Sequence, residues 1–169
     1  MNKIFLVGLP ASGKTTIGRW LANKMNWAFM DIDESIIDES NMSIGAYFNL
    51  YGEDAFRIKE TQILRLSESQ SNLIIACGGG TAAHSDNMKW MQEQGLTIFI
   101  NTDLGTIQTR IYDNPQHRPL FEGKNLIQIR EKLQELSANR SDFHHKSKII
   151  WNKSSPSDFL QLAVSQYFD

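Results

Sequence analysis

Short apolar runs alternate along this chain with longer segments whose apolar residues recur at helical spacing. The apolar runs predict strands at Lys3–Val7, Ala28–Asp31, Asn72–Cys77, Leu96–Asn101 and Lys148–Trp151. The longer segments predict helices near Lys14–Met25, Ala55–Ser67, Asp86–Gln94, Leu104–Tyr112, Leu126–Asn139 and Ser157–Phe168. This alternation is typical of an α/β protein whose parallel sheet is covered by helices on both faces.

One stretch, at about residues 113–125, follows neither pattern. It holds prolines, a glycine and basic side chains, namely Pro115, Arg118, Pro119, Gly123 and Lys124. Irregular loops of this length in compact domains are usually functional or disordered, so we interpret the stretch as a mobile lid. Because no repeat or interdomain linker divides the chain, we expect a single domain over residues 1–169.

Composition narrows the classes of function. The 169 residues are 41% hydrophobic and 21% charged, which is enough for one substantial core. A net charge of −2 without any basic run argues against nucleic-acid binding. The apolar runs are too short to span a membrane, and a strand begins within three residues of the N-terminus, so we expect no membrane segment or signal peptide. With one cysteine, Cys77, no internal disulfide is possible, and a cytoplasmic protein is the simplest expectation.

The first strand leads directly into a complete Walker A loop, Gly8–Thr15, and then into a helix. Its glycines let backbone N–H groups point at the phosphates of a nucleotide. Lys14 supplies a charge for the β- and γ-phosphates, and the Thr15 hydroxyl is a Mg²⁺ ligand. A chance glycine turn is the alternative, but every fixed position of the motif is filled in its required context. The predicted nucleotide-binding residues here are Gly8, Ala11, Ser12, Gly13, Lys14, Thr15 and Thr16.

Unusual residues also follow the second and third strands, at the edge where parallel sheets bind ligands. Asp31 is the candidate to hold Mg²⁺ through water, and Asp33 is the candidate to take a proton from an attacking hydroxyl. Helix capping is the alternative for this pair. The glycines Gly78–Gly80 either admit a ligand close to the backbone or form an ordinary tight turn.

Arg57 and Glu60 are three residues apart in a predicted helix. Such a pair is either a solvated surface ion pair or a device in which the carboxylate orients the guanidinium to grip a substrate carboxylate. Other residues favour structural interpretations. Cys77 is expected to be a buried, inert thiol, and the adjacent His144 and His145 are expected to be solvated or to cap a helix rather than to bind a metal.

Together these motifs resemble the shikimate kinase family, within the P-loop proteins related to nucleoside-monophosphate kinases. The resemblance extends from Ile4 to about Trp151. It rests on Gly8–Thr16, Asp31-Ile32-Asp33, Ser43-Ile44 with Phe48, Gly52-Glu53 with Phe56-Arg57 and Glu60, Gly78–Gly80, Arg118-Pro119-Leu120 and Arg140.

The resemblance implies a three-layer P-loop kinase fold, with a five-stranded parallel sheet in the order 2-3-1-4-5, in a protein that is commonly a monomer. It implies transfer of the ATP γ-phosphoryl group to the 3-hydroxyl of shikimate, with one Mg²⁺ per subunit held by Thr15 and, through water, Asp31. The implied catalytic residues are Lys14, Asp33 and Arg118, with Arg118 reaching the phosphates from the lid and Arg110 near the adenine. The implied substrate-binding residues are Asp33, Phe48, Phe56, Arg57, Glu60, Gly78, Gly79, Gly80 and Arg140.

The chain departs from the family pattern after Arg140, where Ser141-Asp142-Phe143-His144 replaces a usual segment with proline and tyrosine. Asp142 is a new acid that would compete for Arg140. Two other functions remain open. Another small hydroxy-acid kinase, such as a gluconate kinase, would have no need for the Arg57, Arg140 and triple-glycine set around a carboxylated ring. A non-catalytic binding protein should have lost Lys14, Asp33 or Arg118, which this chain retains.

Overall fold

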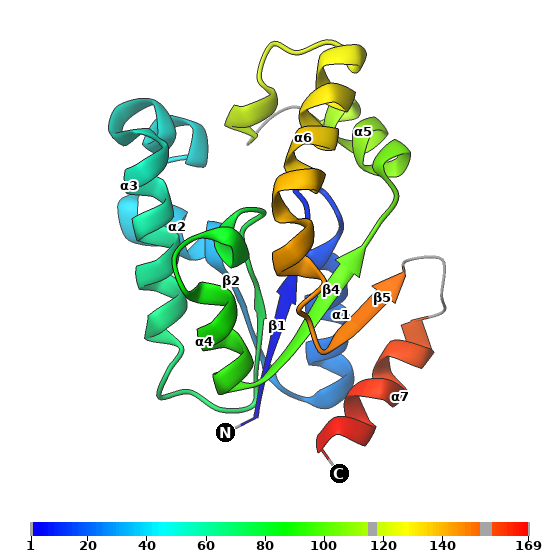
Figure 1. Cartoon of the computed structure of the whole chain (residues 1–169). Coiled ribbons are helices and arrows are strands. Elements are labelled where there is room, and N and C mark those ends of the chain that lie inside the picture. The colour runs from blue at the N-terminus through cyan, green and yellow to red at the C-terminus, as the bar shows by residue number, and fades with distance from the viewer. Residues whose placement is uncertain (1, 115–117, 153–156, 169) are drawn as a thin grey trace.

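A five-stranded parallel sheet forms the centre of the computed structural model, which describes residues 2–114, 118–152 and 157–168 (Figure 1). The strands are β1 (Lys3–Val7), β2 (Ala28–Asp31), β3 (Leu73–Ala76), β4 (Leu96–Asn101) and β5 (Ile149–Asn152). Their order is β2-β3-β1-β4-β5, and every neighbouring pair is parallel. This confirms the fold class and the strand order expected from the sequence.

The helices largely match the expected segments. They are α1 (Lys14–Met25), α2 (Ile32–Ser40), α3 (Ile44–Leu66), α4 (Asn87–Gln94), α5 (Leu104–Asp113), α6 (Leu126–His144) and α7 (Ser157–Phe168), with 3-10 turns η1 (Thr81–Ala83) and η2 (Pro119–Phe121). None of the helices in the described ranges is long and apolar enough to cross a lipid bilayer.

The sequence interpretation missed two stretches of helix. α2 was not expected, and it begins directly after β2 because the Asp31 carboxylate accepts hydrogen bonds from the first free N–H groups of the helix. α3 begins at Ile44 rather than near Ala55. Ser43 caps this start, because its hydroxyl accepts a hydrogen bond from the Ala46 N–H. The path of α3 is broken at Gly52, whose φ of 81° is a left-handed value that glycine adopts without strain.

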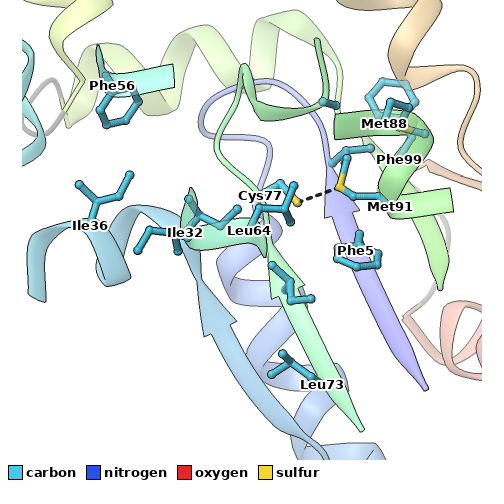
Figure 2. Packing of buried hydrophobic residues seen from close by; sticks show 14 of the residues in the cluster. Phe5, Ile32, Ile36, Phe56, Leu64, Leu73, Cys77, Met88, Met91 and Phe99 are labelled. Atoms are coloured by element: carbon cyan, nitrogen blue, oxygen red, sulfur yellow. Dashed lines mark hydrogen bonds between the residues drawn. The ribbon is translucent and has the colours of Figure 1, made fainter. Parts of the chain in front are cut away.

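Alternate residues of the strands point to two separate cores. On one face, Phe5 of β1 and Leu73 of β3 pack with Leu64 of α3 and Met91 of α4, as Figure 2 shows. The other face packs against α1 and α7. Full burial of one such large apolar side chain stabilises the fold by about 1.5–3 kcal/mol, so these layers hold the strand ends rigidly in place.

Cys77 lies in the first of these cores, and its Sγ contacts Met91 Sδ at 3.5 Å (Figure 2). Burial raises the pKa of the Cys77 thiol far above its usual range, with Lys14 opposing the shift. The thiol therefore stays protonated and inert, as the sequence analysis expected.

Candidate active site

A cavity of about 990 Å³ opens at the carboxyl ends of the central strands, and α3 and α6 rise on either side of it (Figure 1). Most of the candidate site residues line it: Ala11, Gly13, Lys14, Thr15, Thr16, Asp31, Asp33, Phe48, Phe56, Arg57, Glu60, Gly79, Gly80, Arg110, Arg118 and Arg140. Three candidates do not line it: Gly8, Ser12 and Gly78. Residues far apart in the sequence thus converge on one space.

The lysine of the Walker loop is hydrogen-bonded to the backbone of the same loop. Lys14 Nζ donates hydrogen bonds to the carbonyl oxygens of Gly8 and Leu9, at 3.1 and 2.8 Å. Burial lowers the pKa of Lys14, and the nearby carboxylates of Asp33 and Asp31 oppose that shift. A bound phosphate would offer the ammonium group a better partner than two neutral carbonyls.

Two residues outside the Walker loop hold it in place. Thr102, at the end of β4, donates to the Ser12 carbonyl oxygen at 2.8 Å. Arg110, at the end of α5, donates to the Ala11 carbonyl oxygen at 3.0 Å while its side chain also lines the cavity. Arg110 was expected only as a neighbour of the adenine, so its hold on the loop is an additional role.

Asp31 caps α2 and also contacts the Walker loop. Its Oδ1 accepts from the N–H groups of Asp33 and Glu34 at the start of α2, as a helix cap does. Its Oδ2 accepts from the Thr15 hydroxyl at 2.6 Å. The pair therefore presents two adjacent oxygen ligands at the cavity wall, which is the donor type that Mg²⁺ prefers.

Asp33 is a carboxyl group with a perturbed acidity. Burial raises its pKa to about 7, and the carboxylates of Glu60 and Asp31 push it in the same direction, against Lys14 and Arg57. A group that titrates near neutral pH can both accept and release a proton under physiological conditions. The capping role falls to Asp31, which leaves the Asp33 side chain free to face the cavity.

The Arg57–Glu60 pair is buried, with 11% and 1% of the respective side chains exposed. This excludes the interpretation as a solvated surface pair. Arg57 Nη1 donates to Glu60 Oε2 at 2.6 Å, and Nη2 donates to Glu53 Oε1 at 2.9 Å. Burial alone would lower the pKa of Arg57, but the charges and hydrogen bonds of Glu60 and Glu53 together outweigh it, and the pKa is raised.

The three glycines after β3 leave no room for side chains, because other residues of the protein pack closely against them. A Cβ at Gly78 would lie 1.8 Å from Glu60 Oε1, and one at Gly80 would lie 2.6 Å from Arg57 Cζ. A Cβ at Gly79 would lie 2.8 Å from the Pro10 ring. The turn therefore fits closely around the Arg57–Glu60 pair. An ordinary tight turn would not require glycine at all three positions.

Arg140, on α6, lies across the cavity edge and donates to the Gly79 carbonyl oxygen at 2.7 Å. It is only 7% exposed, and burial together with the charge of Arg57 lowers its pKa to about 10. Asp142 is exposed and is not among the ion-pair partners of Arg140 within the described residues. The expected competition from Asp142 is therefore wrong, because the carboxylates whose charges act on Arg140 are those of Glu60, Glu53 and Glu135.

The adjacent histidines behave differently from each other. His144 is buried and stacks on Phe99, with ring centroids 4.7 Å apart, so it is not the solvated or capping residue expected. Burial, with the charges of Lys14 and Arg140, lowers its pKa to about 3, so it stays neutral and acts as an aromatic packing residue. His145 is exposed at the helix end, where its Nδ1 lies 2.8 Å from the Ser141 carbonyl oxygen.

Phe48 and Phe56 form an apolar wall of the cavity, with ring centroids 5.1 Å apart. Part of the expected lid lines the same cavity, through Asp113, Asn114, Arg118, Pro119, Leu120 and Phe121. Phe121 is buried in the apolar cluster between α5 and α6. Residues 115–117 of the expected lid, including Pro115, lie outside the described residues.

Sequence reasoning did not identify several residues that support the site. Pro10 lines the cavity, Thr102 holds the Walker loop, and Thr81 donates to Glu60 Oε1 at 2.7 Å. Thr81 directly follows the triple glycine, and that position was the one available signal. Nothing in the local sequence connects it to a glutamate 21 residues earlier.

Comparisons with known proteins agree with this geometry. A family model described as shikimate kinase matches residues 10–166. A shikimate kinase from Bacteroides thetaiotaomicron is 31% identical over 98% of this chain and 94% of that protein. Another, from a Sulfurihydrogenibium species, is 34% identical over 95% of each chain.

Solved structures give the same result. The structure of shikimate kinase from Acinetobacter baumannii in complex with shikimate has a TM-score of 0.89 at 27% identity, over 100% of this chain and 96% of that one. A gluconokinase from Sinorhizobium meliloti reaches a TM-score of 0.58 at 15% identity, over 99% of this chain and 96% of that one, which indicates a common fold alone.

Proposed function

The chain belongs to the shikimate kinase family, and from that premise we propose roles for the residues that line its cavity. The protein is an ATP-dependent kinase that transfers phosphate to an alcohol, and the alcohol is shikimate. The observation that most supports this assignment is the buried Arg57–Glu60 pair beside Arg140, in the same cavity as the Walker lysine. The phosphoryl group would be received by the 3-hydroxyl.

Arg57 and Arg140 would bind the carboxylate of shikimate. Both guanidinium groups border the cavity, and each is oriented by a hydrogen bond to the protein, to Glu60 and to the Gly79 carbonyl oxygen respectively. Planar guanidinium groups can match both oxygens of a carboxylate at once, which a lysine cannot. Phe48 and Phe56 would pack against the substrate ring.

Lys14 and Arg118 would bind the phosphates of ATP together with the backbone of the Walker loop. Phosphoryl transfer depends mainly on positioning and on neutralising charge, and both of these cations line the same cavity. The adjacent oxygens of Thr15 and Asp31 fit a Mg²⁺ ion, with Asp31 acting through water. The ion would neutralise phosphate charge when it is bound.

Asp33 would accept the proton of the attacking hydroxyl. It lines the cavity, where the charges of Lys14 and Arg57 act on it, and its pKa of about 7 suits a group that must be ionised before the reaction and protonated after it. We further propose a monomeric, cytoplasmic enzyme that binds neither nucleic acid nor membranes, in keeping with the family resemblance and with the net charge of −2.

A coupled ADP-release assay with a panel of hydroxy acids tests the proposed function. With ATP and Mg²⁺, we expect kcat/KM for shikimate to exceed that for gluconate by at least about a hundredfold, because gluconate presents no rigid ring to the aromatic wall. Equal use of gluconate would favour the hydroxy-acid kinase alternative. Shikimate binding by calorimetry without any ADP release would favour the non-catalytic binding protein.

A further inference from the structure

Glu60 is held by the protein at both of its carboxylate oxygens. Oε2 accepts from Arg57 Nη1 at 2.6 Å, and Oε1 accepts from the Thr81 hydroxyl at 2.7 Å. Thr81 is completely buried at the start of η1, and Glu60 is 1% exposed, so water does not replace either donor. The Thr81 hydroxyl therefore decides which way the Glu60 carboxylate faces.

Thr81 is itself anchored to the helix that carries the arginine. Asn87 Nδ2, at the start of α4, donates to the Thr81 carbonyl oxygen at 3.0 Å and to Thr61 Oγ1 at 2.9 Å. The Thr61 hydroxyl donates in turn to the Arg57 carbonyl oxygen at 3.1 Å. The fully buried Asn87 side-chain amide thus joins the end of the glycine turn to α3, close to Arg57 and Glu60.

The glycine turn leaves the pair little freedom on its other side. A methyl group at Gly78 would collide with Glu60 Oε1, and one at Gly80 would collide with the Arg57 guanidinium. A small change in the orientation of the Glu60 carboxylate therefore shifts the Arg57 guanidinium that is bonded to it. Recognition of a planar carboxylate requires ligand groups within about 0.5 Å of the productive geometry.

From this arrangement we propose that Thr81 is a positioning residue for shikimate binding, acting through Glu60 on the Arg57 guanidinium. The inference rests on the proposed function, in which Arg57 binds the substrate carboxylate. Thr81 itself does not line the cavity. Without this hydroxyl, Glu60 Oε1 loses its hydrogen bond from Thr81, and the carboxylate shifts within the narrow space beside the glycine turn. Arg57, which Glu53 also holds, then moves from its binding position.

The test compares Thr81→Val, which removes the hydroxyl and keeps the shape, with Thr81→Ser, which keeps the hydroxyl. We expect Thr81→Val to raise KM for shikimate roughly tenfold, to leave KM for ATP unchanged and to change kcat by less than about twofold. Thr81→Ser should restore KM to near the wild-type value. If Thr81→Val does not fold, Thr81→Ala serves in its place, since it also removes the hydroxyl.

Thr97→Val is the matched control, because Thr97 is equally buried and its Oγ1 accepts from the Lys148 N–H far from the glycine turn. It should lower stability without changing KM for shikimate. An unchanged KM in Thr81→Val would overturn the proposal, as would a fall in kcat with KM unaltered, which indicates a merely structural role. Arg57→Ala, measured in parallel, separates the two hypotheses: if its KM for shikimate is also unchanged, the proposed role of Arg57 fails as well.

Discussion

Replacing Asp33 with asparagine should make the protein more stable and nearly inactive. In the folded protein, burial beside Glu60 and Asp31 raises the pKa of Asp33 from 3.8 to about 7. Between these values the folded state keeps a proton that the unfolded chain has released. The stability associated with this proton is therefore complete below about pH 4 and is lost as pH rises through 7.

The shift sets the size of the effect. A carboxyl group whose pKa rises this far costs the folded state up to about 4 kcal/mol at pH 8. Because Asp33 lies in the first turn of α2, its charge also gains about 0.3–1 kcal/mol from the helix dipole. We therefore expect Asp33→Asn to raise the free energy of unfolding by about 1–3 kcal/mol at pH 8, and by at least about 1 kcal/mol less at pH 5.

Urea denaturation of both proteins at pH 5 and pH 8 measures this difference. Asp38→Asn is the matched control, because Asp38 is exposed on the same helix and its replacement should change stability by less than about 0.5 kcal/mol. In the kinase assay, Asp33→Asn should abolish most of kcat while ATP affinity, measured by calorimetry, stays nearly the same. If Asp33→Asn does not raise the free energy of unfolding, or raises it equally at both pH values, the raised pKa of Asp33 is refuted. If ATP affinity falls as much as kcat, Asp33 is instead a metal or nucleotide ligand.

Three further substitutions are tested in the same kinase assay. Lys14→Met should lower kcat by orders of magnitude, and retention of more than about a tenth of the wild-type value would contradict the role of this lysine. Arg118→Ala should depress kcat much more than shikimate affinity; an unchanged kcat would mean that the segment before α6 is not a catalytic lid. Arg140→Ala should raise KM for shikimate roughly tenfold to a hundredfold, with poor rescue by Arg140→Lys, and an unmoved KM would place the carboxylate elsewhere.

The parts of the fold that could be predicted are those set by local sequence. The run Lys3–Val7 and the Walker loop behind it carry their own signals, apolar strand residues followed by fixed glycines and a lysine. The spacing of Arg57 and Glu60 likewise indicated that they meet. The sequence left open whether this pair was buried, and its burial supports the proposed role in binding the substrate carboxylate.

The remainder depends on contacts between distant parts of the chain. Thr81 and Asn87 meet α3 through hydrogen bonds that join residues more than 20 positions apart, and no local pattern indicates such pairs. α6 runs on to His144 rather than ending near Asn139, because Arg140 and His144 continue its buried face at helical spacing. Polar residues on a buried face look like the end of a helix when only the sequence is considered.

The most direct test of the central claim is identification of the product. Wild-type protein incubated with ATP, Mg²⁺ and shikimate should yield ADP and an equal amount of a phosphate monoester, and phosphorus NMR should place the phosphate on the 3-hydroxyl by its coupling to the proton at that carbon. Release of inorganic phosphate without an ester, or an ester at another hydroxyl, would contradict the assignment of the cavity as the site of shikimate phosphorylation.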